Sequence, residues 1–240
     1  MIRLELGKME DHIKSIEDNS IDSIITDPPF GTTAAKWDEV VDFDLMWKEF
    51  WRVLKPKGMV VSFAAQPFTT DLIYSQRKHY KYSWQWVKEQ GTGQLNCKRR
   101  PMMQTEDIAV FYKKFGTYNP QMREGKAYKR KPVVLKGSLY NGGNDMEVPA
   151  LDRSDRYPLN LLHYNRPIKD RVHPTQKPLG LMEYLARTYN NPGETILDPF
   201  MGSGTTGVAA VRNGYNFIGI EMEQGSFYSC LLYTSDAADE

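Results

Sequence analysis

The stretch of sequence that decides the fold is Leu197–Gly207, which reads LDPFMGSGTTG. It begins at the end of an apolar run and leads into an amphipathic segment, 205–213, so it predicts a strand, a tight turn and a helix in succession. The turn contains G-x-G-x-x-G at Gly202, Gly204 and Gly207. Glycines let a backbone turn tightly and lie against a ligand, and the start of a helix offers free N–H groups. The stretch therefore predicts a ligand-binding turn in an α/β sheet.

An acidic residue, Glu221, ends the next expected strand, 217–220. In dinucleotide-binding folds a carboxylate at such a position accepts hydrogen bonds from the hydroxyls of a ribose. The glycines and this acid together indicate a cofactor that contains a nucleoside, without saying which one. A P-loop is disfavoured because no lysine follows the glycines. An ordinary glycine turn with a surface acid is the alternative.

Outward from this stretch, candidate strands and helices alternate along the chain. The clearest helix is expected at 43–54, where apolar residues recur at helical spacing and Asp42 is placed to cap the first turn. Runs 80–87 and 107–112 are expected to pair as antiparallel strands. The other expected strands are 4–6, 21–26, 59–65, 195–197 and 217–220, and the other expected helices are 70–78, 179–189 and 205–213. Strands separated by helices predict an α/β fold, a largely parallel sheet with helices on both faces.

The composition indicates a folded protein of one domain with an insertion. The chain has 240 residues, of which 40% are hydrophobic and 25% charged, as in globular proteins. No apolar run approaches the ~20 residues that span a bilayer, and the N-terminus lacks the apolar core of a signal peptide. Two cysteines, Cys97 and Cys230, are too few for a disulfide framework or a zinc site. We therefore expect a cytoplasmic protein that binds no metal.

Regular patterning is lost between residues 116 and 164, where Gly, Pro, Asn and charged residues dominate. We expect an inserted, loop-rich module there, between the two halves of a single domain at 1–115 and 165–229. The final segment, 230–240, has neither a helical nor a strand period, and its string resembles a translated sequencing adaptor. We expect that segment to be a non-native read-through tail, and we exclude it from the predicted fold.

A second motif, Asp27-Pro28-Pro29-Phe30, follows the apolar run 21–26. Two prolines cannot continue a central strand, so the chain must turn there. Ligands of open α/β sheets bind beyond the carboxyl ends of strands, which is where Asp27 is expected. A carboxylate, a rigid carbonyl and an aromatic ring suit a planar amine, because the first two accept its hydrogens and the ring stacks on its face. A proline turn with a capping Asp is the plainer alternative.

A third motif, His173-Pro174-Thr175-Gln176-Lys177-Pro178, precedes the helix expected at 179–189. Pro178 suits the first turn of a helix, and Lys177 is placed to meet an anionic group. His173 is expected to be structural. Metal ligation is not expected, because the chain has only four histidines and no metal-like spacing.

Together the three motifs resemble those of the amino-group DNA methyltransferases, which transfer methyl from S-adenosylmethionine to adenine N6 or cytosine N4. The catalytic motif of that family reads [D/S/N]-P-P-[Y/F/W] and is matched by Asp27, Pro28, Pro29 and Phe30. With the catalytic motif first and the cofactor motif near the C-terminus, the order resembles the permuted β arrangement. The resemblance covers roughly residues 2–225. It implies a Rossmann-like sheet of seven strands, one of them antiparallel.

The resemblance also implies roles for individual residues. Asp27 and the Pro28 carbonyl hold the target amine, and Phe30 stacks on a base extruded from the duplex. Glu221 takes the cofactor ribose, and Lys177 is a candidate for its methionine carboxylate. The residues expected at the cofactor are Asp198, Pro199, Phe200, Gly202, Ser203, Gly204, Thr205, Thr206, Glu221 and Lys177. The transfer needs alignment of nucleophile, methyl and sulfur rather than a metal.

A local excess of positive charge indicates how DNA is bound. Residues 98–136 carry eleven lysines and arginines against three acids, whereas the whole chain has a formal net charge of +1. Such a stretch favours phosphate binding, with a merely solvated face as the alternative. In the family, the segment between the motifs recognises the target in double-stranded DNA. The candidate DNA contacts are Lys98, Arg99, Arg100, Lys129, Arg130 and Lys131.

Several alternatives stay open on the sequence. Asp27 favours adenine, because serine is frequent at that position in cytosine enzymes of the family; N4-cytosine methylation is therefore the second reading. RNA as substrate and an inactive DNA-binding remnant are two others. A dinucleotide-dependent oxidoreductase also fits G-x-G-x-x-G, but the segment 27–30 would then have no role. The recognition sequence, a partner restriction enzyme and the choice between monomer and homodimer are not fixed by the sequence.

Overall fold

The computed structural model describes residues 1–33, 35, 38–167 and 175–230. It divides into two compact units, of which the first comprises Met1–Asn119 and Asn160–Glu240 and the second is Pro120–Leu159. The second unit falls within the insertion expected at 116–164. The tail segment 231–240 and His173 and Pro174 of the third motif lie outside the described residues, whereas Cys230 is buried in the core of the first unit.

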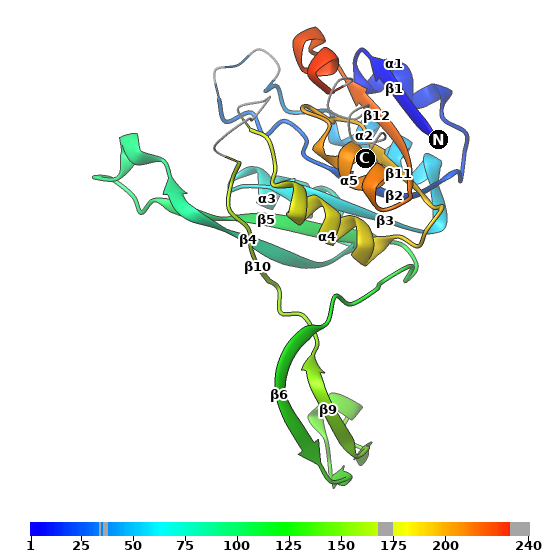
Figure 1. Cartoon of the computed structure of the whole chain (residues 1–240), viewed down its shortest axis with the longest axis vertical. Helices are drawn as coiled ribbons and strands as arrows, with labels where there is room; N and C mark the ends of the chain where they lie inside the picture. Colours follow the sequence, from blue (N-terminus) through cyan, green and yellow to red (C-terminus); the bar gives the residue numbers. More distant parts are fainter. Residues whose placement is uncertain (34, 36–37, 168–174, 231–240) are drawn as a thin grey trace. The chain divides into compact units, whose positions relative to one another are not determined.

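The first unit is built on a sheet of eight strands in the order β1-β12-β11-β2-β3-β5-β4-β10 (Figure 1). The strands are β1 (Ile2–Leu6), β2 (Ile21–Thr26), β3 (Leu54–Ala64), β4 (Tyr80–Thr92), β5 (Met103–Tyr112), β10 (Leu161–His163), β11 (Thr195–Asp198) and β12 (Asn216–Glu221). Only β5 runs antiparallel to its neighbours β3 and β4; every other pair in this sheet is parallel. The predicted α/β fold with one antiparallel strand is confirmed. The sheet has eight strands rather than seven because the short β10 pairs with the edge of β4.

Helices cover both faces of this sheet, as predicted. One face packs against α1 (Met9–His12), α2 (Phe43–Val53) and α3 (Phe68–Ser75), and the other against α4 (Leu179–Tyr189) and α5 (Thr205–Arg212). The alternation of side chains along each strand divides the core: Ile24 packs on the first face and Ile25 on the second. Asp42 caps α2 as expected, because its Oδ1 accepts hydrogen bonds from the amides of Asp44 and Leu45 at 2.9 and 3.2 Å.

The second unit contains paired strands, so the expectation of a loop-rich module there is wrong in that respect. Strand β6 (Arg123–Arg130) pairs antiparallel with β9 (Leu151–Arg156), and β7 (Val133–Leu135) pairs with β8 (Met146–Val148). Almost every residue of β6 is exposed and its sequence, REGKAYKR, has no apolar alternation. A strand that buries neither face shows no alternation of apolar and polar residues, because it is defined by its backbone hydrogen bonds alone. The sequence therefore gives no sign of it.

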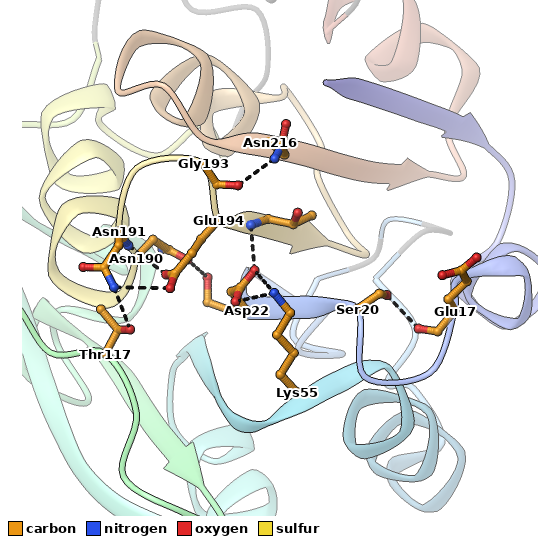
Figure 2. A network of polar contacts seen from close by, with 12 residues as sticks. Glu17, Ser20, Asp22, Lys55, Thr117, Asn190, Asn191, Gly193, Glu194 and Asn216 are labelled. Atoms are coloured by element: carbon orange, nitrogen blue, oxygen red, sulfur yellow. Dashed lines mark hydrogen bonds and ion pairs between the residues drawn. The ribbon is translucent and has the colours of Figure 1, made fainter.

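The amino edge of the parallel strands is closed by a polar network (Figure 2). Asp22, in β2, accepts hydrogen bonds from Lys55 Nζ at 2.7 and 2.8 Å and from the amide of Thr195 at 3.0 Å. Glu194 accepts from the amide and the side chain of Asn191 at 2.7 and 3.2 Å. The network joins the starts of neighbouring strands, and ligand binding is expected at the opposite, carboxyl edge.

Candidate active site

Three carboxylates leave neighbouring parallel strands at the carboxyl edge of the sheet. Asp27 follows β2, Asp198 is the last residue of β11, and Glu221 is the last residue of β12. The strand order β12-β11-β2 places the ends of these three strands side by side. All three carboxylates line one cavity of about 850 Å³. A cavity of this size accommodates a small-molecule ligand.

Asp27 presents one occupied and one open carboxylate oxygen. Its Oδ2 lies 2.6 Å from the Nζ of Lys177. Its Oδ1 is buried and has no hydrogen-bond partner among the described residues. Burial raises the pKa of Asp27 to about 6; the Lys177 ammonium opposes the shift, and the Glu106 carboxylate adds to it. Asp27 therefore combines a fixed orientation with an unused acceptor at the cavity.

Lys177 belongs to a row of four alternating charges, Lys88, Glu106, Lys177 and Asp27, which we call the charge row. Glu106 lies 2.7 Å from Lys88 through Oε2 and 2.9 Å from Lys177 through Oε1. The Lys177 ammonium also lies over the ring of Phe63, 4.8 Å from its centroid. The side chains of both lysines are 11% exposed and that of Glu106 is 8% exposed, so this is a buried ionic network.

The buried charges keep one another ionised. Burial opposes the charged form of Lys177, but the carboxylates of Asp27 and Glu106 outweigh it and raise the pKa of Lys177. Burial likewise opposes the charge on Glu106, and the two lysines outweigh it and lower the pKa of Glu106. A buried charge is costly unless it is paired in this way, so each member depends on its neighbours.

Asp198 is fully engaged by the protein. Its Oδ1 accepts from Thr26 Oγ1 at 2.8 Å and from the amide of Phe200 at 3.2 Å, and its Oδ2 accepts from Thr206 Oγ1 at 2.5 Å. Burial raises the pKa of Asp198 to about 7, and these donors oppose that shift. The residue ties the end of β2 to the start of α5, which fixes the glycine turn between them.

The glycine turn and Glu221 form another wall of the cavity. Gly202 and Gly204 have φ angles of +51° and +75°, which L side chains rarely adopt. Glu221 is buried, which raises its pKa, and its two oxygens accept from the amides of Gly202 and Glu223 at 2.8 and 2.7 Å. A Cβ on Gly204 would lie 2.1 Å from the Cys230 sulfur, so this glycine is required for packing as well as for conformation.

The structure brings most of the predicted site residues together. Those that line the cavity are Asp27, Pro28, Pro29, Phe30, Lys177, Asp198, Pro199, Phe200, Gly202, Ser203, Thr205, Thr206 and Glu221. The Phe30 ring also stacks on Phe68, with centroids 5.0 Å apart. Lys177 contacts Asp27 and Glu106, and its role toward a cofactor carboxylate stays a prediction.

The candidate DNA contacts lie outside the cavity lining, in two places. Lys98, Arg99 and Arg100 are exposed on the connection between β4 and β5 in the first unit. Lys129 and Arg130 belong to β6 of the second unit and Lys131 follows them. Lys129 pairs with Asp152 at 2.9 Å, and Arg130 donates to the Pro149 carbonyl at 3.2 Å. Their contact with DNA stays a prediction.

Sequence reasoning did not find two charged members of the site, Lys88 and Glu106. A signal exists, because Lys88 continues the every-second-residue phase of Trp84 and Trp86, which are both buried. Glu106 stands in the same phase as the buried Ile108 on β5. A charged residue in the buried phase of a strand must be paired, and two such residues on adjacent strands indicate a buried ion pair.

Comparison with known proteins agrees with this geometry. The sequence profile of the N6/N4 DNA methylase family matches residues 21–230. The chain belongs to this DNA methylase family. Its sequence is 30% identical over 228 residues to the type II methyltransferase M.HpaI of Haemophilus parainfluenzae, covering 88% of this chain and 67% of that protein. It is 28% identical to the type II methyltransferase M1.MboII of Moraxella bovis, covering 91% and 93% of the two chains.

Solved DNA methylase structures share the fold. The M1.HpyAVI–SAM complex is 26% identical, with a TM-score of 0.66, and the match covers 97% of this chain and 98% of that one. The PvuII cytosine-N4-specific DNA methyltransferase is 16% identical with a TM-score of 0.71, covering 99% and 91%; at that identity the likeness concerns the fold alone. In the described part of this DNA methylase, no helix is long and apolar enough to cross a membrane.

Proposed function

We propose that this DNA methylase transfers a methyl group from S-adenosylmethionine to the exocyclic amine of a base flipped out of duplex DNA, with adenine N6 as the target. The observation that carries the proposal is the open Oδ1 of Asp27. It is a buried acceptor without a partner among the described residues, and Asp27 lines the same cavity as the glycine turn and Glu221. A buried acceptor left unpaired is costly, so a ligand donor at this atom is the natural occupant.

The chain's own groups account for the reaction. Asp27 Oδ1 and the Pro28 carbonyl accept the two amine hydrogens, which directs the nitrogen lone pair away from them, and Phe30 stacks on the base. S-adenosylmethionine supplies an electrophilic methyl group on a positively charged sulfur. The amine nitrogen–carbon bond forms as the sulfur–carbon bond breaks, and a proton from the methylated amine passes to solvent. The protein contributes alignment of these groups.

The glycine turn supplies the residues that fit the methyl donor. Glu221 is the acceptor for the ribose hydroxyls, and each of its oxygens keeps a further lone pair beyond the amides that it already binds. Gly202 and Ser203 line the cavity beside it, where a side chain on Gly202 would be strained. Phe200 offers an apolar face on the same wall.

The preference for adenine rests on Asp27 in the first position of the catalytic motif, and cytosine N4 is the competing target. Incubation with tritiated S-adenosylmethionine and duplex DNA, followed by digestion to nucleosides, separates the two products. We expect label in N6-methyl-2′-deoxyadenosine. Label in N4-methyl-2′-deoxycytidine would retain the enzyme class and overturn adenine as the target base. Absence of label with wild-type protein and varied DNA would overturn the function.

A further inference from the structure

We propose that Glu106 is a positioning residue: it anchors the Lys177 ammonium on Oδ2 of Asp27, so that Oδ1 stays open for the amine of the flipped base. The inference rests on the function proposed above. It assigns a role to Glu106, a residue of strand β5 that belongs to neither the catalytic motif nor the cofactor motif.

The contacts of Glu106 are divided between two lysines. Its Oε2 lies 2.7 Å from Lys88 and its Oε1 lies 2.9 Å from Lys177, whose Nζ reaches Oδ2 of Asp27 at 2.6 Å. Lys177 is therefore held from two sides by carboxylates. Three residues of this row, Lys88, Glu106 and Lys177, come from separate parts of the sequence, and all four line the cavity.

Stability alone does not account for this arrangement. The desolvation of buried charges offsets most of their mutual attraction, and apolar side chains of similar volume stabilise a core as well or better. The charge row ends at a carboxylate whose second oxygen has no partner among the described residues. An oriented acceptor is something that an apolar replacement cannot supply.

Removing the charge of Glu106 has a definite consequence for Lys177. An ammonium group has three donors, and without Glu106 the remaining anionic neighbour of Lys177 in the described part of the chain is Asp27. Lys177 is then free to bridge both oxygens of Asp27 and to occupy Oδ1. The charged groups that act on Asp27 among the described residues are Lys177, Glu106 and Lys88, and buried Asp198 also interacts with it.

The test starts with Glu106→Gln, which keeps the size and removes the charge. We expect kcat to fall about tenfold or more, while the Kd for S-adenosylmethionine stays unchanged. The acidic limb of the rate–pH profile should move to lower pH, because a negative charge near Asp27 is lost. Glu49→Gln is the matched control: Glu49 is also buried and pairs with Arg52 at 2.7 Å, but it does not line the cavity. It should alter stability and leave both kcat and the acidic limb unchanged.

A double-mutant cycle tests whether Glu106 acts through Lys177. If it does, Glu106→Gln costs little in a Lys177→Met background, and the two losses are far from additive. Additive losses in kcat, or a parental kcat in Glu106→Gln, overturn the proposal. Should Glu106→Gln fail to fold, Lys88→Met/Glu106→Gln removes one charge of each sign. It carries the same expectation for kcat and a smaller shift of the acidic limb, because Lys88 lowers the pKa of Asp27.

A second measurement does not depend on turnover. Carbon-13 NMR of protein labelled at the aspartate carboxyls follows the titration of Asp27, assigned with Asp27→Asn. We expect Asp27 to titrate at lower pH in Glu106→Gln and at higher pH in Lys177→Met, relative to the parent. If Asp27 titrates at the parental pH in both variants, the proposal that Glu106 acts on Asp27 through Lys177 is overturned. Absence of methyl transfer by the parent protein would overturn the proposed function and leave this titration as the test of Glu106.

Discussion

The two edges of the sheet differ in how they bind an aspartate, since one aspartate lies at each end of strand β2. At the amino edge, Asp22 receives Lys55 on both oxygens and the Thr195 amide on one of them (Figure 2). At the carboxyl edge, Asp27 receives Lys177 on one oxygen, and its other oxygen has no partner among the described residues. Each aspartate is paired with a lysine at a similar distance. Among the described residues, only Asp27 of the two has a carboxylate oxygen without a hydrogen-bond partner.

The surroundings of the two lysines explain the difference. Lys55 is 45% exposed, so water competes for its ammonium and the pair contributes little to stability. Lys177 is 11% exposed and has a second carboxylate, Glu106, behind it. A polar group near water needs no permanent partner, whereas a buried open acceptor persists only where the surrounding network fixes it. The comparison indicates that the polar groups at the carboxyl edge are arranged to bind a ligand, whereas those at the amino edge hold neighbouring strands together.

Asp27→Asn should have the largest effect, a loss of methyl transfer of about 10²-fold or more, by analogy with the removal of oxyanion donors. Lys177 favours the amide oxygen at the Oδ2 position, which places the NH₂ group, a donor, where the substrate amine needs an acceptor. Affinity for S-adenosylmethionine should change little. Asp22→Asn is the matched control, with expected parental turnover. Near-parental turnover in Asp27→Asn would remove Asp27 from the reaction.

Glu221→Ala should weaken binding of S-adenosylmethionine by about 1.5–3 kcal/mol, the range for hydrogen bonds to charged groups. That corresponds to roughly 10- to 150-fold in Kd. Glu194→Ala at the amino edge is the control, because Glu194 also accepts a backbone amide and a second N–H group. Calorimetry should show a parental Kd in that control. An unchanged Kd in Glu221→Ala would exclude Glu221 from the cofactor site.

The rate of methyl transfer should fall as the pH drops through about 6. Burial raises the pKa of Asp27 to about 6, so the carboxylate is ionised above that pH and protonated below it. Because Lys177 occupies Oδ2, the added proton belongs on Oδ1 and blocks the acceptor. With one essential ionisation in the free enzyme, kcat/KM should fall about tenfold per pH unit below the pKa. A flat profile between pH 5 and 8, measured on protein shown to be folded throughout that range, would contradict the requirement for an ionised Asp27.

These expectations show how far the sequence alone can lead. The motifs locate Asp27 and Glu221 because each follows an apolar strand, and the carboxyl ends of parallel strands meet at one edge. The sequence does not reveal that Lys177 reaches Asp27, since that contact joins residues 150 positions apart. It also misses the paired strands of the second unit, because β6 is exposed and lacks alternation.

The basic triplet of the second unit, in which Lys129 and Lys131 are exposed and Arg130 is half-buried, tests whether charge outside the cavity contributes to function. If Lys129, Arg130 and Lys131 bind phosphates, their joint replacement by Ala should flatten the salt dependence of DNA binding, by about 0.9 log unit per log of salt for each phosphate that is no longer neutralised. Affinity should fall similarly for target and non-target DNA, measured by fluorescence titration. A greater loss for target DNA would mean that one of them reads a base. An unchanged slope and affinity would make the triplet a solvated face and direct the search to Lys98, Arg99 and Arg100.

The smallest effect is expected for Lys55→Met, the amino-edge counterpart of Lys177→Met. Both substitutions remove an ammonium that lies within 2.7 Å of an aspartate on or next to β2. Lys55 is solvated and Asp22 keeps the Thr195 amide, so the free energy of unfolding should change by about 0–1 kcal/mol, with parental methyl transfer. Lys177→Met should instead slow methyl transfer and raise the pH at which Asp27 titrates. Urea unfolding and initial rates on both variants give the comparison directly. Equal losses of activity in the two would mean that a lysine beside either aspartate serves only the fold, and the distinction between the two edges would fail.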